Sequence, residues 1–212
     1  MTYTKQVDNK HYAFETYMTK ERWCSVWHQV DEIQKLKPSK ILEIGAGTGL
    51  FKAVCAVFGH TVETLDIDPD LNPDHVGTVT EMPFPNVSYD VVCAFQVLEH
   101  LPYVSALSAF SEMVRVSNRY IILSLPDDKK MLRYKFYIPK VGEYDLLLPH
   151  PFKKHRHHQF DGEHYWEINK CGYELDKVIK DFSICANLTN TYLVRDNPYH
   201  RFFIFERDRS SY

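Results

Sequence analysis

A glycine-rich turn flanked by two acidic residues is the feature of this sequence that most directly suggests chemistry. The stretch 41–50 reads ILEIGAGTGL, with glycines at positions 45, 47 and 49. A glycine lets the backbone approach a ligand closely, because no Cβ intervenes. Such a turn between a buried strand and a helix is typical of a nucleotide-type site.

The two acids indicate the charge of the ligand. Glu43 lies two residues before the first glycine, where it would repel a pyrophosphate and attract a cation such as an ammonium group. Leu50 stands where a dinucleotide-binding fingerprint has its third glycine. Asp66 follows Gly49 by 17 residues, and a carboxylate there can accept both hydroxyls of a ribose. We therefore expect a nucleoside-like ligand that carries positive charge.

Histidines supply the candidate acid–base groups. His100 follows Glu99 just after the apolar run YDVVCAF, and the carboxyl ends of strands are where open α/β sheets place their chemistry. His158 and His164 lie in the later stretch FKKHRHHQFDGEHYWE. We take His100 and His164 as catalytic candidates, with helix capping as the alternative role of His100. The histidine spacing is irregular and matches no zinc motif, so we predict no metal site.

The elements that must position these residues follow from the hydrophobic pattern. Short apolar runs alternate with helical periodicity, which predicts βαβ units, a parallel sheet and helices on both faces. The expected strands are 41–44, 62–65, 76–79, 89–95 and 120–125, and the expected helices are 19–36, 50–58 and 104–114. A helix at 167–182 and an antiparallel pair at 183–194 and 201–206 complete the chain.

Length and composition fit one globular domain over residues 1–212. We divide it into an N-terminal helical segment (1–39), a cofactor-binding core (40–126), an insertion (127–166) and a C-terminal helix with a strand pair (167–212). The net charge of −3 gives no reason to expect DNA as a partner. Five scattered cysteines without a CxxC pair indicate reduced thiols in the cytoplasm. No apolar run reaches the roughly 18 residues of a membrane span, and none at the start resembles a secretory signal.

The insertion holds an excess of aromatic and basic residues. Residues 127–212 contain 16 of the 30 aromatic side chains. Segment 129–158 carries eight Lys or Arg residues against two acids, a local charge of +6. We expect residues 127–166 to cap the active site and to favour an aromatic or anionic substrate. A surface loop with solvated charges is the alternative.

With these features the chain resembles the class I S-adenosylmethionine-dependent methyltransferases of the small-molecule branch. Their first motif, E/D-x-G-x-G-x-G, is matched by Glu43 and the three glycines, and their ribose acid by Asp66. The stretch EMPFPNVSYDVVCAFQVLEHLP is similar to their LPF…SFDVV…VLEHL pattern. The resemblance implies a Rossmann-like sheet of seven mostly parallel strands with the last antiparallel. It also implies direct in-line methyl transfer from S-adenosylmethionine to a small molecule.

The resemblance also implies roles for individual residues. Those expected to bind the cofactor are Glu43, Gly45, Ala46, Gly47, Asp66, Ile67, Thr78, Phe95 and Gln96. Asp66 would hold the ribose, Ile67 would pack on the adenine, and Thr78 replaces an Asp that many relatives place beside the adenine. Those expected near the substrate are Tyr17, Trp27, Glu99, Tyr134, His158, Tyr165 and Trp166. Arg22 is a candidate for the methionine carboxylate.

Three other functions fit parts of the pattern. One is a non-catalytic S-adenosylmethionine-binding subunit that supports a partner. Another is a methyltransferase acting on a protein or RNA, which the local +6 charge would suit. Leu50 and Glu43 disfavour the third, a nicotinamide oxidoreductase. The stretch AFQVLEHL lacks the D/N-P-P-Y/F motif of enzymes that methylate base amino groups.

Overall fold

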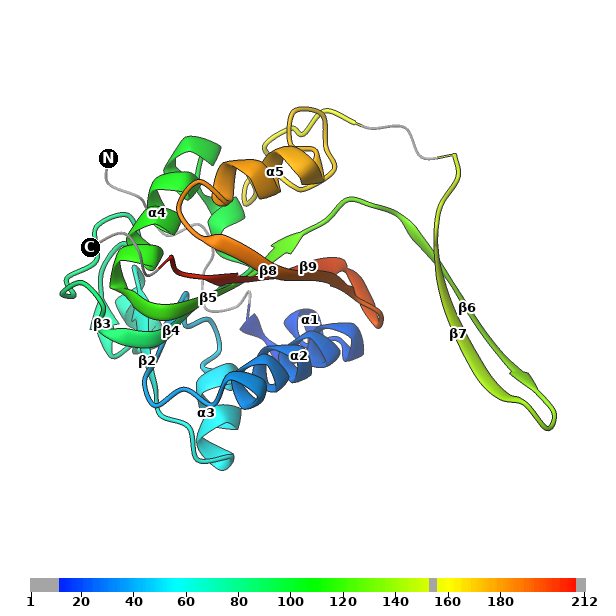
Figure 1. The fold of residues 1–212 in the computed structure, drawn as a ribbon, viewed down its shortest axis with the longest axis horizontal. Helices are drawn as coiled ribbons and strands as arrows, with labels where there is room; N and C mark the ends of the chain where they lie inside the picture. The colour runs from blue at the N-terminus through cyan, green and yellow to red at the C-terminus, as the bar shows by residue number, and fades with distance from the viewer. Residues whose placement is uncertain (1–11, 153–155, 209–212) are drawn as a thin grey trace.

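The computed structural model describes residues 12–152 and 156–208, and its centre is a seven-stranded sheet. The strand order is β3-β2-β1-β4-β5-β9-β8. Neighbours from β3 to β5 are parallel, whereas β9 is antiparallel to both β5 and β8 (Figure 1). The bounds are β1 Ile41–Ile44, β2 Val62–Asp66, β3 His75–Val76, β4 Tyr89–Phe95, β5 Ser117–Pro126, β8 Asn187–Val194 and β9 Asn197–Glu206. The expected Rossmann-like α/β fold is confirmed.

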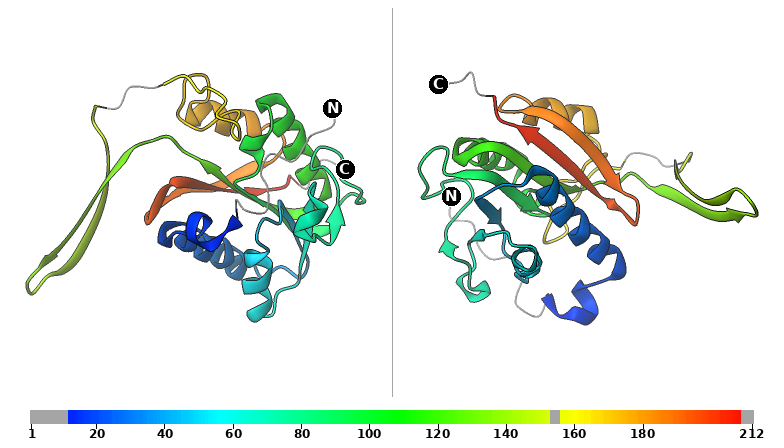
Figure 2. Two further views of the ribbon diagram at one scale, coloured as in Figure 1. Left: turned by 180° about the vertical axis from the view of Figure 1, so that it is seen from behind. Right: turned by 60° about the horizontal axis from the view of Figure 1, so that its bottom comes forward.

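Helices cover both faces of this sheet (Figures 1 and 2). One face carries α1 (Phe14–Tyr17), α2 (Lys20–Leu36) and α3 (Leu50–Val57), and the other carries α4 (Tyr103–Val116) and α5 (Leu175–Phe182). Each face has its own apolar cluster, so the central strands are buried on both sides. This explains why β1 is buried at every position and why β4 is mostly apolar rather than alternating. None of these helices is long and apolar enough to cross a membrane.

Local signals set the ends of α2 as the sequence predicts. The Thr19 hydroxyl accepts a hydrogen bond from the Arg22 backbone N–H at 3.2 Å and so caps the first turn. Lys37 adopts a left-handed conformation after Leu36, and Pro38 follows it. This helix is packed against the sheet through its buried residues Val26, Val30 and Ile33.

Two predicted elements are shorter than expected. The helix predicted at 167–182 begins only at Leu175, because Asn169 and Gly172 have positive φ angles of 65° and 87° and break the chain into turns. The strand predicted at 76–79 is limited to His75–Val76, because Thr78 instead forms an isolated antiparallel bridge with Glu81.

The insertion is largely a separate β-hairpin of β6 (Met131–Ile138) and β7 (Gly142–Pro149). These strands pair only with each other, and the hairpin projects as an arm away from the sheet and helices (Figures 1 and 2). At its base Arg133 binds Asp145 and Asp196, which neutralises part of the local positive charge. Lys153 and Lys154, counted in the +6, lie outside the described residues. That residues 127–166 cap the active site stays a prediction, because the hairpin forms only part of that segment.

A buried ion pair holds the end of β5. The Asp127 carboxylate, 1% exposed, accepts a hydrogen bond from Arg201 Nε of β9 at 2.7 Å. Its other oxygen accepts from the Asn169 side chain at 2.7 Å and from the Lys129 backbone at 2.8 Å. This carboxylate therefore ties β5, β9 and the turns before α5 together.

We expect the substitution Asp127→Ala to lower the free energy of unfolding by about 3–5 kcal/mol, because it leaves Arg201 buried without a counter-charge. Urea denaturation followed by circular dichroism measures this loss. The double variant Asp127→Ala/Arg201→Met removes the orphaned charge and should recover much of the stability. A single variant within about 1 kcal/mol of the wild type would contradict the structural role assigned to this pair.

Candidate functional site

The glycine turn after β1 is held close to the turn after β4. Gly45 has φ 79°, and a Cβ added to it would lie 2.5 Å from Cγ2 of Val97. The Gly45 backbone N–H donates to the Leu65 carbonyl of β2 at 2.9 Å, and the Ala46 N–H donates to Asp66 Oδ2 at 2.8 Å. Only glycine fits at position 45, because both the φ angle and the space exclude a side chain.

A cavity of about 300 Å³, here called the main cavity, opens at the carboxyl ends of β1, β2 and β4. This is where ligands bind in open α/β sheets. Most of the residues expected to bind a cofactor line it, namely Gly45, Gly47, Asp66, Ile67, Thr78, Phe95 and Gln96. The structure therefore brings together residues that span more than 50 positions of the sequence.

A second hollow of about 60 Å³, here called the side cavity, adjoins the main cavity and shares Gly45, Gly47 and Gln96 with it. Glu43 and Ala46 line it, together with Arg22 from α2. Glu43 is 4% exposed, and its Oε2 has no hydrogen-bond partner among the described residues. Burial, reinforced by the charge of Asp66, raises the pKa of Glu43. A buried carboxylate in this position favours a cationic ligand group.

The two carboxylates near the turn have different surroundings. Asp66 accepts backbone hydrogen bonds from Ala46 and Asp68 at 2.8 and 2.9 Å, whereas Glu43 has an orphaned oxygen. Burial raises the pKa of Asp66 even though these hydrogen bonds oppose the shift. Each Asp66 oxygen can still accept a further hydrogen bond from a ligand.

Gln96 shows the backbone strain often found at functional positions. It follows β4 with φ 57°, a left-handed angle that is unusual for a residue other than glycine. Its backbone N–H donates to the Ser124 carbonyl at 2.9 Å, and its Nε2 donates to the Ser124 hydroxyl at 3.3 Å. These contacts with β5 hold Gln96 where it faces both cavities.

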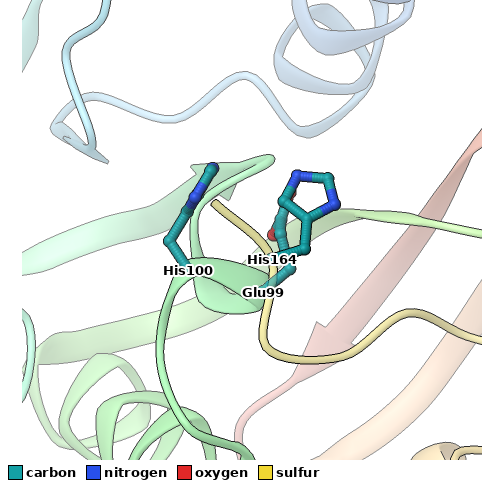
Figure 3. A group of neighbouring side chains, drawn as sticks. All are labelled: Glu99, His100 and His164. Carbon is teal, nitrogen blue, oxygen red and sulfur yellow. The ribbon is translucent and has the colours of Figure 1, made fainter. Parts of the chain in front are cut away.

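The two catalytic candidates lie side by side, but only His100 lines the main cavity, whereas His164 lines neither cavity. His100 comes from the short helix η3 (Leu98–His100), and His164 from the segment that precedes α5 (Figure 3). Their ring centroids are 5.1 Å apart. His100 lines the cavity with its neighbour Leu101, and so does Tyr165 from the opposite segment. The Tyr165 N–H donates to the Glu99 carbonyl at 2.8 Å and holds the two segments together.

Glu99 is fully buried behind these histidines. Its side chain lies beside the His164 ring, and neither of its carboxylate oxygens has a hydrogen-bond partner among the described residues (Figure 3). Burial raises the pKa of Glu99 to about 7, although the nearby His164 opposes the shift. Burial would lower the pKa of His164, but its hydrogen bond with Glu167 and the charge of Glu99 raise it instead.

Five of the expected substrate residues do not line either cavity, and one of them is the fully buried Glu99 described above. Trp27 is 60% exposed on the outer side of α2, and Tyr134 lies on the projecting hairpin. Trp166 is a core residue whose Nε1 donates to the Leu98 carbonyl at 3.3 Å. His158 supports the histidine pair from behind, through a 2.8 Å hydrogen bond between its Nε2 and the His164 carbonyl.

Tyr12 is a cavity residue that the sequence did not reveal. It lines the main cavity, and its ring meets that of Tyr17 edge-on, with 5.0 Å between centroids. Tyr17 was expected here and lines both cavities, with the Arg22 guanidinium 4.0 Å above its ring. The polar N-terminal stretch has no periodicity, so no signal in the sequence singled out Tyr12.

Comparison with known proteins places this site in context. Residues 14–175 match a family model described as a methyltransferase domain. A search of curated proteins finds no match. Among solved structures, a Pyrococcus horikoshii protein is similar with 14% identity and a TM-score of 0.64, over 95% of this chain and 100% of its own.

Two enzymes of known activity share the fold. Magnesium protoporphyrin IX methyltransferase from Synechocystis PCC 6803, solved with bound S-adenosylhomocysteine, is 15% identical with a TM-score of 0.58, over 89% of this chain and 84% of its own. The 1,6-didemethyltoxoflavin-N1-methyltransferase of Burkholderia thailandensis is 10% identical with a TM-score of 0.56, over 88% of this chain and 77% of its own. At sequence identities of 10–15%, these similarities show a shared fold and nothing further.

The close approach at Gly45 can be tested against a matched glycine. Gly59 also has a positive φ, 83°, but a Cβ there would meet nothing within 4 Å. We expect Gly59→Ala to cost about 1 kcal/mol of unfolding free energy from backbone strain alone. Gly45→Ala should cost roughly 1–3 kcal/mol more, because the added methyl group must displace Val97. Urea denaturation measures both losses, and equal losses would contradict the close approach.

Proposed function

The chain belongs to this methyltransferase-domain family, and from that premise we propose that it transfers a methyl group from S-adenosylmethionine to a small molecule with an aromatic part. One observation above all supports the choice of cofactor. The glycine turn is bordered by the buried carboxylate of Glu43, which suits a cationic ligand and disfavours a pyrophosphate, and by the half-buried carboxylate of Asp66, which suits ribose hydroxyls.

Each part of the cofactor has a proposed binding group. Asp66 accepts the ribose hydroxyls with the lone pairs that its backbone contacts leave, and Ile67 packs on the adenine. Thr78, whose hydroxyl is hydrogen bonded to that of Thr80, lies at the adenine end of the cavity. The methionine end fits the side cavity, where Glu43 attracts the ammonium group and Arg22 attracts the carboxylate.

The turn itself shapes the passage between adenosine and methionine. Gly45, Ala46 and Gly47 lie along it, and Phe95 and Gln96 face it from the end of β4. The sulfonium therefore sits near Gln96. This position directs its methyl group toward the end of the main cavity formed by His100 and Tyr165. Alignment of the methyl group with an attacking atom supplies much of the catalysis in such a displacement.

The acceptor class follows from the lining of that end. Tyr165 offers a ring surface and Leu101 an apolar side chain, while Tyr12 and Tyr17 line the same cavity next to Gly47. These groups suit a flat, partly apolar molecule. The preference for an anionic acceptor that the insertion suggested has no support from the hairpin, because no residue of β6 or β7 lines the main cavity or the side cavity.

His100 and His164 are the proposed acceptor-side residues. A hydroxyl acceptor must lose its proton as the methyl group is transferred, and imidazole nitrogens are suited to assist that loss. His100 reaches the cavity, and His164 lies behind it, with ring centroids 5.1 Å apart. The location we propose for the enzyme is the cytoplasm, which the five unpaired cysteines support.

The proposed cofactor can be tested directly by calorimetry with S-adenosylhomocysteine and with NAD⁺. We expect the first to bind with one site per chain and the second not to bind, because Glu43 would repel its pyrophosphate. A methyl-transfer screen over phenols, catechols and neutral aliphatic alcohols then tests the acceptor class. Tight binding of NAD⁺ without binding of S-adenosylhomocysteine would overturn the proposed function.

A substitution of Asp66 tests the proposed ribose contact most directly. Asp66→Asn should raise the dissociation constant for S-adenosylhomocysteine about 10- to 100-fold, because hydrogen bonds to a charged group contribute about 1.5–3 kcal/mol. Asp176→Asn, an exposed acid at the start of α5, is the matched control and should leave the affinity unchanged. Calorimetry measures both. An Asp66→Asn chain with wild-type affinity would show that the ribose lies elsewhere.

A further inference from the structure

We propose that Glu99, His100 and His164 bind a divalent transition-metal ion such as Zn²⁺, and that an oxygen of the methyl acceptor completes its coordination. The metal site stands on the geometry of these three side chains. The role of the ion toward the acceptor rests on the proposed function.

The three side chains form a compact group of metal-ligating atoms. One ligand atom from each residue lies within 4.8 Å of the others (Figure 3). Around an ion with bonds of about 2.0–2.2 Å, ligand atoms lie roughly 3–3.5 Å apart, so small side-chain rotations bring all three to one ion. His164 follows the Glu99–His100 pair by more than 60 residues, which is why sequence spacing gave no sign of the group.

Both histidines are oriented as metal ligands usually are. His100 Nδ1 lies 3.0 Å from the Glu163 carbonyl oxygen, which can only accept, so Nδ1 carries the proton and the lone pair lies on Nε2. His164 Nδ1 lies 3.1 Å from Glu167 Oε1, and Tyr199 donates to the same oxygen at 2.9 Å. A carboxylate or carbonyl behind each imidazole is the arrangement that fixes a ligating histidine.

The burial of the Glu99 carboxylate without hydrogen-bond partners in the described part of the chain is the observation that indicates a bound ligand. The side chain is fully buried, yet neither oxygen has a hydrogen-bond partner among the described residues. A buried carboxylate without partners is costly, and a bound cation would remove that cost. Arg22 is near enough to lower the pKa of Glu99 but makes no hydrogen bond with it.

A neighbouring group of Asp161, His164 and Glu167 also has metal-ligating atoms within reach of one another. Its acids, however, already have partners. Asp161 Oδ1 accepts the backbone N–H groups of Glu163 and His164, and Glu167 accepts from Tyr199 and contacts His164. We therefore assign this group to the support of His164 and place the ion at Glu99.

The ligand set indicates the kind of ion. Two imidazole nitrogens and one carboxylate suit Zn²⁺, Mn²⁺ or Fe²⁺, whereas Mg²⁺ prefers oxygen ligands. Three protein ligands leave coordination positions for another molecule. Because His100 lines the main cavity, an ion bound to it lies at the wall where the acceptor is proposed to sit.

An ion in this position favours acceptors with a hydroxyl group, and above all those with two adjacent oxygens. With their lone pairs on the ion, the two imidazoles assist the loss of the acceptor proton through the metal rather than as bases. Coordination makes the hydroxyl more acidic, so its proton passes to solvent and the oxygen becomes nucleophilic. The oxygen then attacks the methyl carbon while the carbon–sulfur bond breaks. The electron pair of the carbon–sulfur bond moves to sulfur, and neutral S-adenosylhomocysteine is the leaving group. The preferred substrate class is therefore phenols and catechols.

Titration of the chelator-treated full chain with Zn²⁺ alone, followed by calorimetry, tests the site. We expect one ion per chain, and Glu99→Gln and His164→Gln should each weaken binding by roughly 100-fold or more, since even the loss of a supporting group costs 10- to 100-fold. His157→Gln is the matched control, because His157 is an exposed side chain on the same segment. Co²⁺ absorption in the visible range provides a second readout.

Each outcome decides one part of the inference. No stoichiometric uptake of Zn²⁺ by the wild type, or equal affinity in Glu99→Gln and His157→Gln, overturns the metal site. S-adenosylhomocysteine affinity, measured on the same samples, shows that the variants are folded and tests the proposed function separately. Zn²⁺ binding without S-adenosylhomocysteine binding would overturn the proposed function and keep the metal site. Catechol methylation by the wild type that survives removal of the metal would overturn the role toward the acceptor.

Discussion

The close approach of two turns at the carboxyl edge of the sheet is the constraint on which the site depends. Gly45 after β1 and Val97 after β4 leave no room for a Cβ between them. The backbone of the same turn is also tied to β2 through the Leu65 carbonyl and the Asp66 carboxylate. The cavity-lining residues at the ends of β1, β2 and β4 are therefore fixed by short backbone contacts rather than by long flexible side chains. The cavity is preorganised for this reason.

Beyond this edge the site divides into two regions of different chemistry. Around the glycine turn, the buried Glu43 and the half-buried Asp66 favour a cationic nucleoside. Around η3, the histidines are joined to the segment before α5 by the Tyr165–Glu99 backbone hydrogen bond and by Trp166. Gln96 lies between the regions with a strained backbone. Methyl transfer requires such a division, because donor and acceptor must meet in line at one point.

How much of this could be predicted from the sequence depends on whether the information is local. The buried strands, the cap of α2 and the glycine turn are each specified by adjacent residues, so the core of the fold was predicted. Most of the residues predicted to bind the cofactor line one cavity, which is as far as the structure takes that prediction. The pairing of His164 with Glu99 is a tertiary contact without a local signal. The hairpin also escaped prediction. Its basic and aromatic residues suggested a cap, but they pair as two strands of a hairpin, and Tyr134 of β6 lines neither cavity.

The measurement that tests the central claim most directly is a crystal structure of the chain with bound S-adenosylhomocysteine. The account predicts the ribose hydroxyls on the Asp66 carboxylate, the amino group beside Glu43 and the sulfur near Gln96, facing the His100 end of the main cavity. A ligand bound outside this cavity, or with its sulfur directed away from His100, would contradict the account.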